Sequence, residues 1–180
     1  MRIDPAPHWE NDVVRLAVLT PEDVSDAYVD WLNDSEINRY LESRFAVHDR
    51  AGVAAYVESM LASPSSLFLA IHSKALDQHV GNIKIGPIDR HHGLGEIGLM
   101  IGARAAWGRG IATHAIAAIA DIGFRDLGLR KLTAGCYADN KGSRIAFERA
   151  GFTVEAVRRA HFVSDGRLED LVLLARFADH

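Results

Sequence analysis

The sequence predicts an α/β fold with a mixed, mostly antiparallel sheet and helices on both of its faces, in one domain over residues 1–180. Short apolar runs alternate with segments whose apolar residues recur every three or four positions, a pattern that indicates strands alternating with helices. Of the 180 residues, 48% are hydrophobic and 24% are charged, which is typical of a globular domain with one core.

The first third of the chain predicts one strand and three helices. Val13–Leu19 reads as a strand. A helix is expected from Thr20 to Leu32, because Thr20 can cap its first turn and the following proline suits the first helical position. A short helix over Ser35–Leu41 and a longer one over Asp49–Leu61 follow.

The rest of the chain predicts two strand–helix units flanked by strands. We expect strands at Leu67–His72, Val80–Ile88 and Glu96–Ile101, a long helix at Gly110–Leu127, a strand at Lys131–Tyr137, a helix at Gly142–Ala150, and final strands at Val154–Val163 and Leu168–Phe177. The resulting order is β-α-α-β-β-β-α-β-α-β-β.

Composition argues against several classes of protein. The net charge of -4, with both signs interspersed, argues against a partner that is nucleic acid or an anionic membrane. With Cys136 as its single cysteine, the chain can form neither an internal disulfide nor a cysteine-based zinc site, and its histidines are not spaced for a metal. The first residues lack the apolar run of a signal peptide and no run is long enough to span a bilayer, so a cytoplasmic protein is expected.

The stretch AWGRGIATHAI, residues 106–116, is the strongest functional signal. Gly108 and Gly110 flank Arg109 where a strand gives way to a helix. The first amides of a helix lack internal partners and lie at the positive end of its dipole, and glycines there let a phosphate approach the backbone. A simple strand-to-helix turn would also explain the two glycines, and both readings stay open on the loop alone.

Familiar phosphate loops do not fit this stretch, but an extended ligand does. A P-loop needs Lys and then Ser or Thr at the helix start, where this chain has Ile111. A dinucleotide loop would place a third glycine at Thr113 and would lie early in the chain. Glycines 95, 98 and 102 in the preceding strand indicate a bulge or a close approach of a ligand to the backbone, and a bulge would splay the strand from its neighbour. A ligand with a pyrophosphate end and a thin amide-bearing arm suits such a gap, and coenzyme A has that shape.

Two motifs resemble those of the GNAT superfamily, the Gcn5-related N-acetyltransferases. The first is Gln/Arg-x-x-Gly-x-Gly/Ala, which reads here as Trp107-Gly-Arg-Gly-Ile-Ala112. The tryptophan at the first position of this motif resembles the branch of ribosomal-protein N-terminal acetyltransferases. The second runs from Asn140-Lys-Gly-Ser143 through an aliphatic helix to Gly151-Phe152. The resemblance implies the acyltransferase fold, acetyl-CoA as cosubstrate without a metal, and direct transfer to an amine.

The resemblance also implies roles for individual residues. The amides of Arg109, Gly110, Ile111, Ala112 and Thr113 would hold the pyrophosphate, and main-chain groups of Leu99, Met100 and Ile101 would orient the pantetheine and thioester. Asn140 and Ser143 would face the pantetheine arm and the sulfur. Phe147 stands where many members carry a tyrosine that protonates the departing thiolate, so it is expected only to contact the cosubstrate, and Ser143 becomes the candidate for assisting the thiolate.

The acceptor side is less specific. Glu96, which opens the glycine-rich strand, and His92, in the loop before it, are candidates for removing the amine's proton. A structural partner role for Glu96 and a solvent-exposed loop position for His92 are the simpler explanations. Asn33, Tyr40, Glu42 and Arg44 are candidates for binding the acceptor. Their segment resembles members that act in surface-polysaccharide metabolism, which favours a nucleotide-linked amino sugar. A peptide N-terminus, a CoA-binding module without catalysis, and a homodimer remain open.

Overall fold

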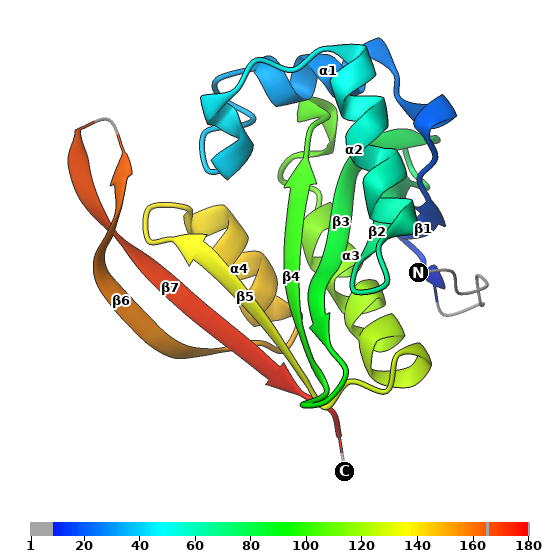
Figure 1. Ribbon diagram of the computed structural model, residues 1–180. Helices are drawn as coiled ribbons and strands as arrows, with labels where there is room; N and C mark the ends of the chain where they lie inside the picture. Colours follow the sequence, from blue (N-terminus) through cyan, green and yellow to red (C-terminus); the bar gives the residue numbers. More distant parts are fainter. Residues whose placement is uncertain (1–8, 165, 180) are drawn as a thin grey trace.

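The computed structural model describes residues 9–164 and 166–179, and within these ranges seven strands form one sheet in the order β1-β2-β3-β4-β5-β7-β6 (Figure 1). Neighbouring strands are antiparallel except β4 and β5, which are parallel. The strands are β1 Val14–Val18, β2 Leu67–Ser73, β3 Gln78–Asp89, β4 Leu94–Ile101, β5 Lys131–Tyr137, β6 Thr153–Ser164 and β7 Arg167–Phe177.

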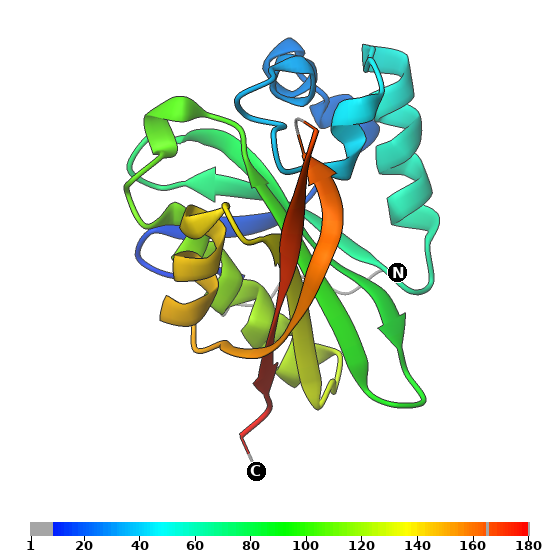
Figure 2. The same cartoon turned by 90° about the vertical axis from the view of Figure 1, so that its left-hand side faces the viewer.

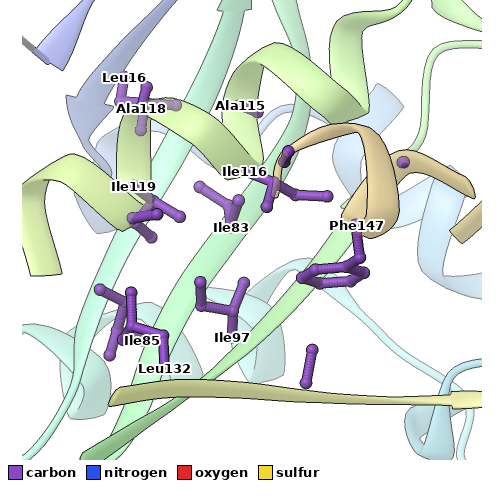
Figure 3. Close-up of a cluster of buried hydrophobic side chains, with 14 of the residues drawn as sticks. Leu16, Ile83, Ile85, Ile97, Ala115, Ile116, Ala118, Ile119, Leu132 and Phe147 are labelled. Carbon is purple, nitrogen blue, oxygen red and sulfur yellow. The ribbon is translucent and has the colours of Figure 1, made fainter. Parts of the chain in front are cut away.

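Helices cover both faces of the sheet, as predicted (Figure 2). α1 (Asp26–Asn33) and α2 (Arg50–Ala62) pack on one face, and α3 (Ile111–Asp121) and α4 (Lys141–Arg149) on the other. The main core lies under α3, where Ile116 and Ile119 meet Ile83, Ile85 and Ile97 of the central strands (Figure 3). All five side chains are buried, which anchors α3 against β3 and β4.

The sheet opens at its centre, which confirms the predicted splay. β4 and β5 pair only over Leu94–Glu96 and Lys131–Thr133. Beyond Glu96 the two strands separate, and Figure 1 shows β5, β7 and β6 turning away from β4. The β5-facing backbone of β4 beyond this point has no partner in β5, so it can hydrogen-bond an extended ligand.

The predicted bulge in the glycine-rich strand is wrong, because the extra residue lies in β3. The register shifts between Ile85 and Ile88, where three steps along β3 face two along β4. Pro87 lies within this interval and has no N–H to donate to the ladder, which favours a bulge there. Gly95 has a packing reason instead, since a Cβ at this position would lie 2.6 Å from Cγ2 of Ile85.

The first predicted helix is interrupted. A 3₁₀ turn covers Pro21–Asp23, and α1 begins later, at Asp26. The Asp23 carboxylate accepts bonds from the backbone N–H and the hydroxyl of Thr20, which closes the short turn. Ser25 then caps α1 by accepting from the Tyr28 amide at 3.2 Å. A second capping residue inside the predicted helix therefore splits it into two pieces.

The predicted helix over Ser35–Leu41 is wrong. This segment forms turns, and a 3₁₀ helix follows at Glu42–Phe45. Asp34 Oδ1 accepts from the amides of Glu36 and Ile37 at 3.0 and 3.2 Å, an arrangement that competes with a helix. The remaining helices are confirmed with small shifts at their ends. α3 continues into a π-helical turn over Ile122–Asp126.

Candidate functional site

The glycine loop forms an open helix start. Gly108 and Gly110 have φ of +71° and +75°, and Gly110 is the N-cap of α3. A Cβ on Gly108 would meet nothing within 4 Å, and one on Gly110 would first meet the His114 ring at 3.7 Å. Trp107 Nε1 donates to the Ile101 carbonyl at 2.8 Å and ties the loop to the end of β4. The loop therefore leaves room for an anion at the free amides of the helix.

A cavity of about 870 Å³ extends from this loop into the gap between β4 and β5. It brings together most of the residues expected to bind the cosubstrate, although they come from three separate elements. Arg109 is the exception, since it is exposed and lies outside the lining. The predicted residues that line the cavity are Leu99, Met100, Ile101, Gly110, Ile111, Ala112, Thr113, Asn140, Ser143 and Phe147.

The α4 side of this cavity is built by the second sequence motif. Asn140 caps α4 by accepting from the Ser143 amide at 3.2 Å. Gly151 has φ of +87° and ends the helix, and the Phe152 amide donates to the Phe147 carbonyl at 3.0 Å. The Phe147 ring is 1% exposed and packs edge-on against Phe152. On the α4 side of the cavity, the hydroxyl therefore belongs to Ser143, because Phe147 has none.

Tyr137, at the end of β5, joins the two sides of the larger cavity. Its hydroxyl accepts a bond from Arg44 Nη2 at 2.9 Å and donates to the Glu42 carboxylate. Its ring stacks on Phe162 at 3.9 Å between centroids. Burial, together with the bond to Glu42, raises the pKa of Tyr137, so the phenol stays protonated at neutral pH. Tyr40 and Glu42 line the cavity, and Arg44 holds their segment against β5.

A second cavity of about 350 Å³ lies between the sheet and helices α1 and α2. It shares Gly98, Leu99 and Met100 with the larger cavity, so the two meet along β4. A Cβ on Gly98 would have nothing within 4 Å, and this open space lies at the junction. Sequence reasoning missed Asn82 and Lys84 in its lining, although two polar residues within the apolar run of β3 were an available signal.

Three predicted site residues lie elsewhere. Glu96 is exposed at the point where β4 and β5 part and lines neither cavity. His92 is exposed in the β3–β4 turn, where its backbone N–H donates to Asp89 and its carbonyl accepts from Arg130. The Asn33 amide bonds the backbone of Val29 and His48. The structure therefore gives Asn33 and His92 local structural contacts.

Other chemistry has little support in the described part of the chain. Burial raises the pKa of the Cys136 thiol, which keeps it protonated and weakly nucleophilic. Among residues 9–164 and 166–179, no group of three or more His, Cys, Asp or Glu side chains is placed to hold a metal ion. In the same residues, no helix has the length and apolarity needed to cross a membrane.

A splayed sheet, with the free amides of a helix N-terminus beside the gap, is the arrangement of a CoA-dependent acyltransferase. The model of the acetyltransferase (GNAT) domain matches residues 14–153, and the chain belongs to this family. It is therefore an N-acetyltransferase that uses acetyl-CoA as its cosubstrate, as the two motifs predicted.

Relatives and solved structures agree with the family. The uncharacterized N-acetyltransferase p20 of Bacillus licheniformis is 25% identical over 153 residues, which cover 84% of this chain and 85% of the relative. Spermidine N-acetyltransferase from Vibrio cholerae, solved with CoA and spermine, has a TM-score of 0.82 at 20% identity, covering 93% and 96% of the two chains. RimL, a ribosomal L7/L12 α-N-protein acetyltransferase solved with CoA, has a TM-score of 0.81 at 18% identity, covering 94% and 96%. The likeness to these two structures supports the fold.

Proposed function

We propose that this chain transfers the acetyl group of acetyl-CoA directly to a primary amine, with the two substrates entering from opposite faces of β4. The observation that carries the proposal is the meeting of the two cavities at Gly98, beside the unpaired edge of β4. When bound, acetyl-CoA supplies the thioester whose carbonyl the amine attacks. Residues 110–113 would hold its pyrophosphate, and the backbone of Leu99–Ile101 would orient its arm.

Side chains of the larger cavity would remove the amine's proton and assist the departing thiolate. Ser143 would hydrogen-bond the departing thiolate, since Phe147 lacks a hydroxyl. Glu42 lines the cavity and is held by Tyr137 and Arg44, which supports it over Glu96 as the group that takes the amine's proton. Glu96 and His92 line neither cavity, so either would act only through intervening waters.

For the amine that accepts the acetyl group, the resemblance in the sequence supplies the first candidate. A nucleotide-linked amino sugar remains the sequence-based prediction. The spermine-bound and ribosomal-protein enzymes that share this fold make polyamines and peptide N-termini the alternatives to compare. A homodimer remains a prediction as well.

The test is acetyl-CoA-dependent release of CoA thiol with a panel of amines, with the acetylated product identified by mass spectrometry. The panel holds nucleotide-linked amino sugars, peptides, polyamines, aminoglycosides and free amino acids. We expect thiol release that depends on one class of amine and yields its N-acetyl product. Tight binding of acetyl-CoA without turnover on any amine would contradict the proposal and favour a CoA-binding module.

A further inference from the structure

The second cavity has an apolar body. Its walls come from α1, α2 and the sheet, and they carry two phenol rings, a phenyl ring and aliphatic side chains. With about 350 Å³, it lies at the small end of ligand pockets. The apolar wall residues are Tyr28, Leu32, Leu41, Val53, Tyr56, Phe68, Leu99 and Met100.

None of the described residues that line this cavity is a carboxylate. Two acidic residues, Glu36 and Glu42, line the larger cavity next door, and neighbours hold one carboxylate oxygen of each. Arg104 Nη2 lies 2.8 Å from Glu36, and Arg44 and Tyr137 hold Glu42. An acceptor with several ammonium groups would therefore find no carboxylate in the described part of the wall of the second cavity itself.

Lys84 supplies a positive charge at the junction of the two cavities. It lies between Phe68 and Gly98 in the sheet, is half-buried and lines both cavities. Lys84 forms no ion pair with any of the residues that the structure describes. A partly desolvated ammonium without a partner repels a second cation and attracts an anion.

Asn82 adds an unused donor two residues earlier on the same face of β3. The residue is 4% exposed and lines the second cavity. Its Oδ1 contacts His79 Nε2 at 2.9 Å, and its Nδ2 has no hydrogen-bond partner among the described residues. A buried amide N–H is costly to leave unpaired, so an acceptor oxygen in the cavity would be stabilising.

From this arrangement we propose that the acceptor is an amino acid with an apolar side chain, bound as a single residue with a free carboxylate. The inference rests on the proposed function, because it assigns the amine substrate of that reaction. The side chain would lie against Tyr28, Tyr56 and Phe68, and the carboxylate would contact Lys84 and Asn82. The α-amine would then face Gly98 and the thioester. Its attack forms the N–C bond and breaks the C–S bond; the amine loses a proton and the CoA thiolate gains one.

The test compares thiol release with L-phenylalanine, L-leucine, phenethylamine, spermidine, a nucleotide-linked amino sugar and a short peptide. Phenethylamine has the ring and the amine of phenylalanine without its carboxylate. We expect kcat/KM for L-phenylalanine to exceed that for phenethylamine at least tenfold, and spermidine to be a poor substrate. Faster turnover of spermidine, the amino sugar or the peptide would overturn the inference and leave the proposed transferase activity intact.

Two variants locate the effect. Lys84→Met should remove most of the preference for phenylalanine over phenethylamine and leave the affinity for acetyl-CoA within about twofold. Lys74→Met, which removes a charge outside both cavities, should change neither quantity. An unchanged preference in Lys84→Met would overturn the inference.

A binding measurement covers the case without turnover. L-phenylalanine titrated into the CoA-saturated protein should bind, and Asn82→Leu should weaken that binding. If acetyl-CoA binds and no amine releases thiol, the proposed function fails. The assignment of the second cavity then depends on this titration. It would be overturned if L-phenylalanine showed no detectable binding.

Discussion

Glu42 is held in place by Arg44 of its own 3₁₀ helix and by Tyr137 of β5, and Glu96 has no such contacts with the residues that the structure describes. The carboxylate of Glu42 accepts from the Tyr137 hydroxyl and pairs with Arg44 Nη1 at 3.4 Å. Glu96 is exposed and lines neither cavity. If Glu42 takes the amine's proton, its position matters for the chemical step, whereas the charge of Glu96 does not.

Glu42→Gln should therefore lower kcat about a hundredfold, the smaller end of general-base effects, with little change in the affinity for acetyl-CoA. Glu96→Gln is the matched control and should stay within about threefold of the unmodified protein, because no proton passes through it. Steady-state kinetics on both variants decides the matter. A larger loss of kcat in Glu96→Gln than in Glu42→Gln would identify Glu96 as the general base.

Ser143 is the residue that we propose to assist the thiolate in place of the missing tyrosine. Ser143→Ala should lower kcat about tenfold and keep the affinity for acetyl-CoA, because the hydroxyl would contact only the departing thiolate. Single-turnover kinetics with calorimetry measures the two quantities separately. Equal losses in both would indicate that Ser143 binds the cosubstrate and does not assist the leaving group.

At the scale of elements, α4 depends on its cap. Asn140 Oδ1 is the side-chain acceptor for the first turn of a helix that carries Ser143 and Phe147 into the cavity. The cavity wall should therefore loosen when the cap is lost, even though the helix is also held by Phe147 and Phe152 in the core.

Asn140→Ala should cost about 1 kcal/mol of unfolding free energy, the ordinary value for a lost N-cap. Asn140→Asp should restore most of it, because aspartate caps equally well. Urea unfolding measures both. A full loss in Asn140→Asp as well would indicate that the amide N–H₂, and not the capping oxygen, stabilises the element.

At the scale of the whole molecule, a half-buried histidine links stability to pH. Desolvation lowers the pKa of His72, helped by His79, whose ring centroid is 5.6 Å away, and by Arg15. The unfolded chain then binds more protons than the folded one once the pH falls below about 6.5, the ordinary histidine pKa. Stability is therefore lost as the pH drops through this range.

His72→Gln should flatten the fall in unfolding free energy between about pH 7 and pH 5, the range in which an ordinary histidine gains its proton. Urea unfolding at several pH values measures this, with His91→Gln as a control in an exposed turn. A slope that is unchanged in His72→Gln would assign the pH dependence to other groups.

The sequence predicts the local structure well at positions where a residue type favours a single conformation. Gly110 and Gly151 both have positive φ at a helix end, so the loop and the end of α4 follow from local rules. The prediction failed where two local preferences compete. After Asp34 the spacing of apolar residues favours a helix, but the Asp34 side chain accepts from the next amides and stabilises turns instead. The second cavity is built by residues from α1, α2 and three strands, and no spacing in the sequence brings those together.

The most direct test of acetyl-CoA binding in the splayed sheet is calorimetry on two valine variants. Gly110→Val adds a branched side chain at the start of α3, and Gly128→Val imposes a comparable backbone strain at φ of +64° in an exposed loop outside both cavities. We predict at least tenfold weaker acetyl-CoA binding in Gly110→Val and unchanged binding in Gly128→Val, with both proteins folded. Unchanged affinity in a folded Gly110→Val would contradict the account, because the pyrophosphate would then lie elsewhere.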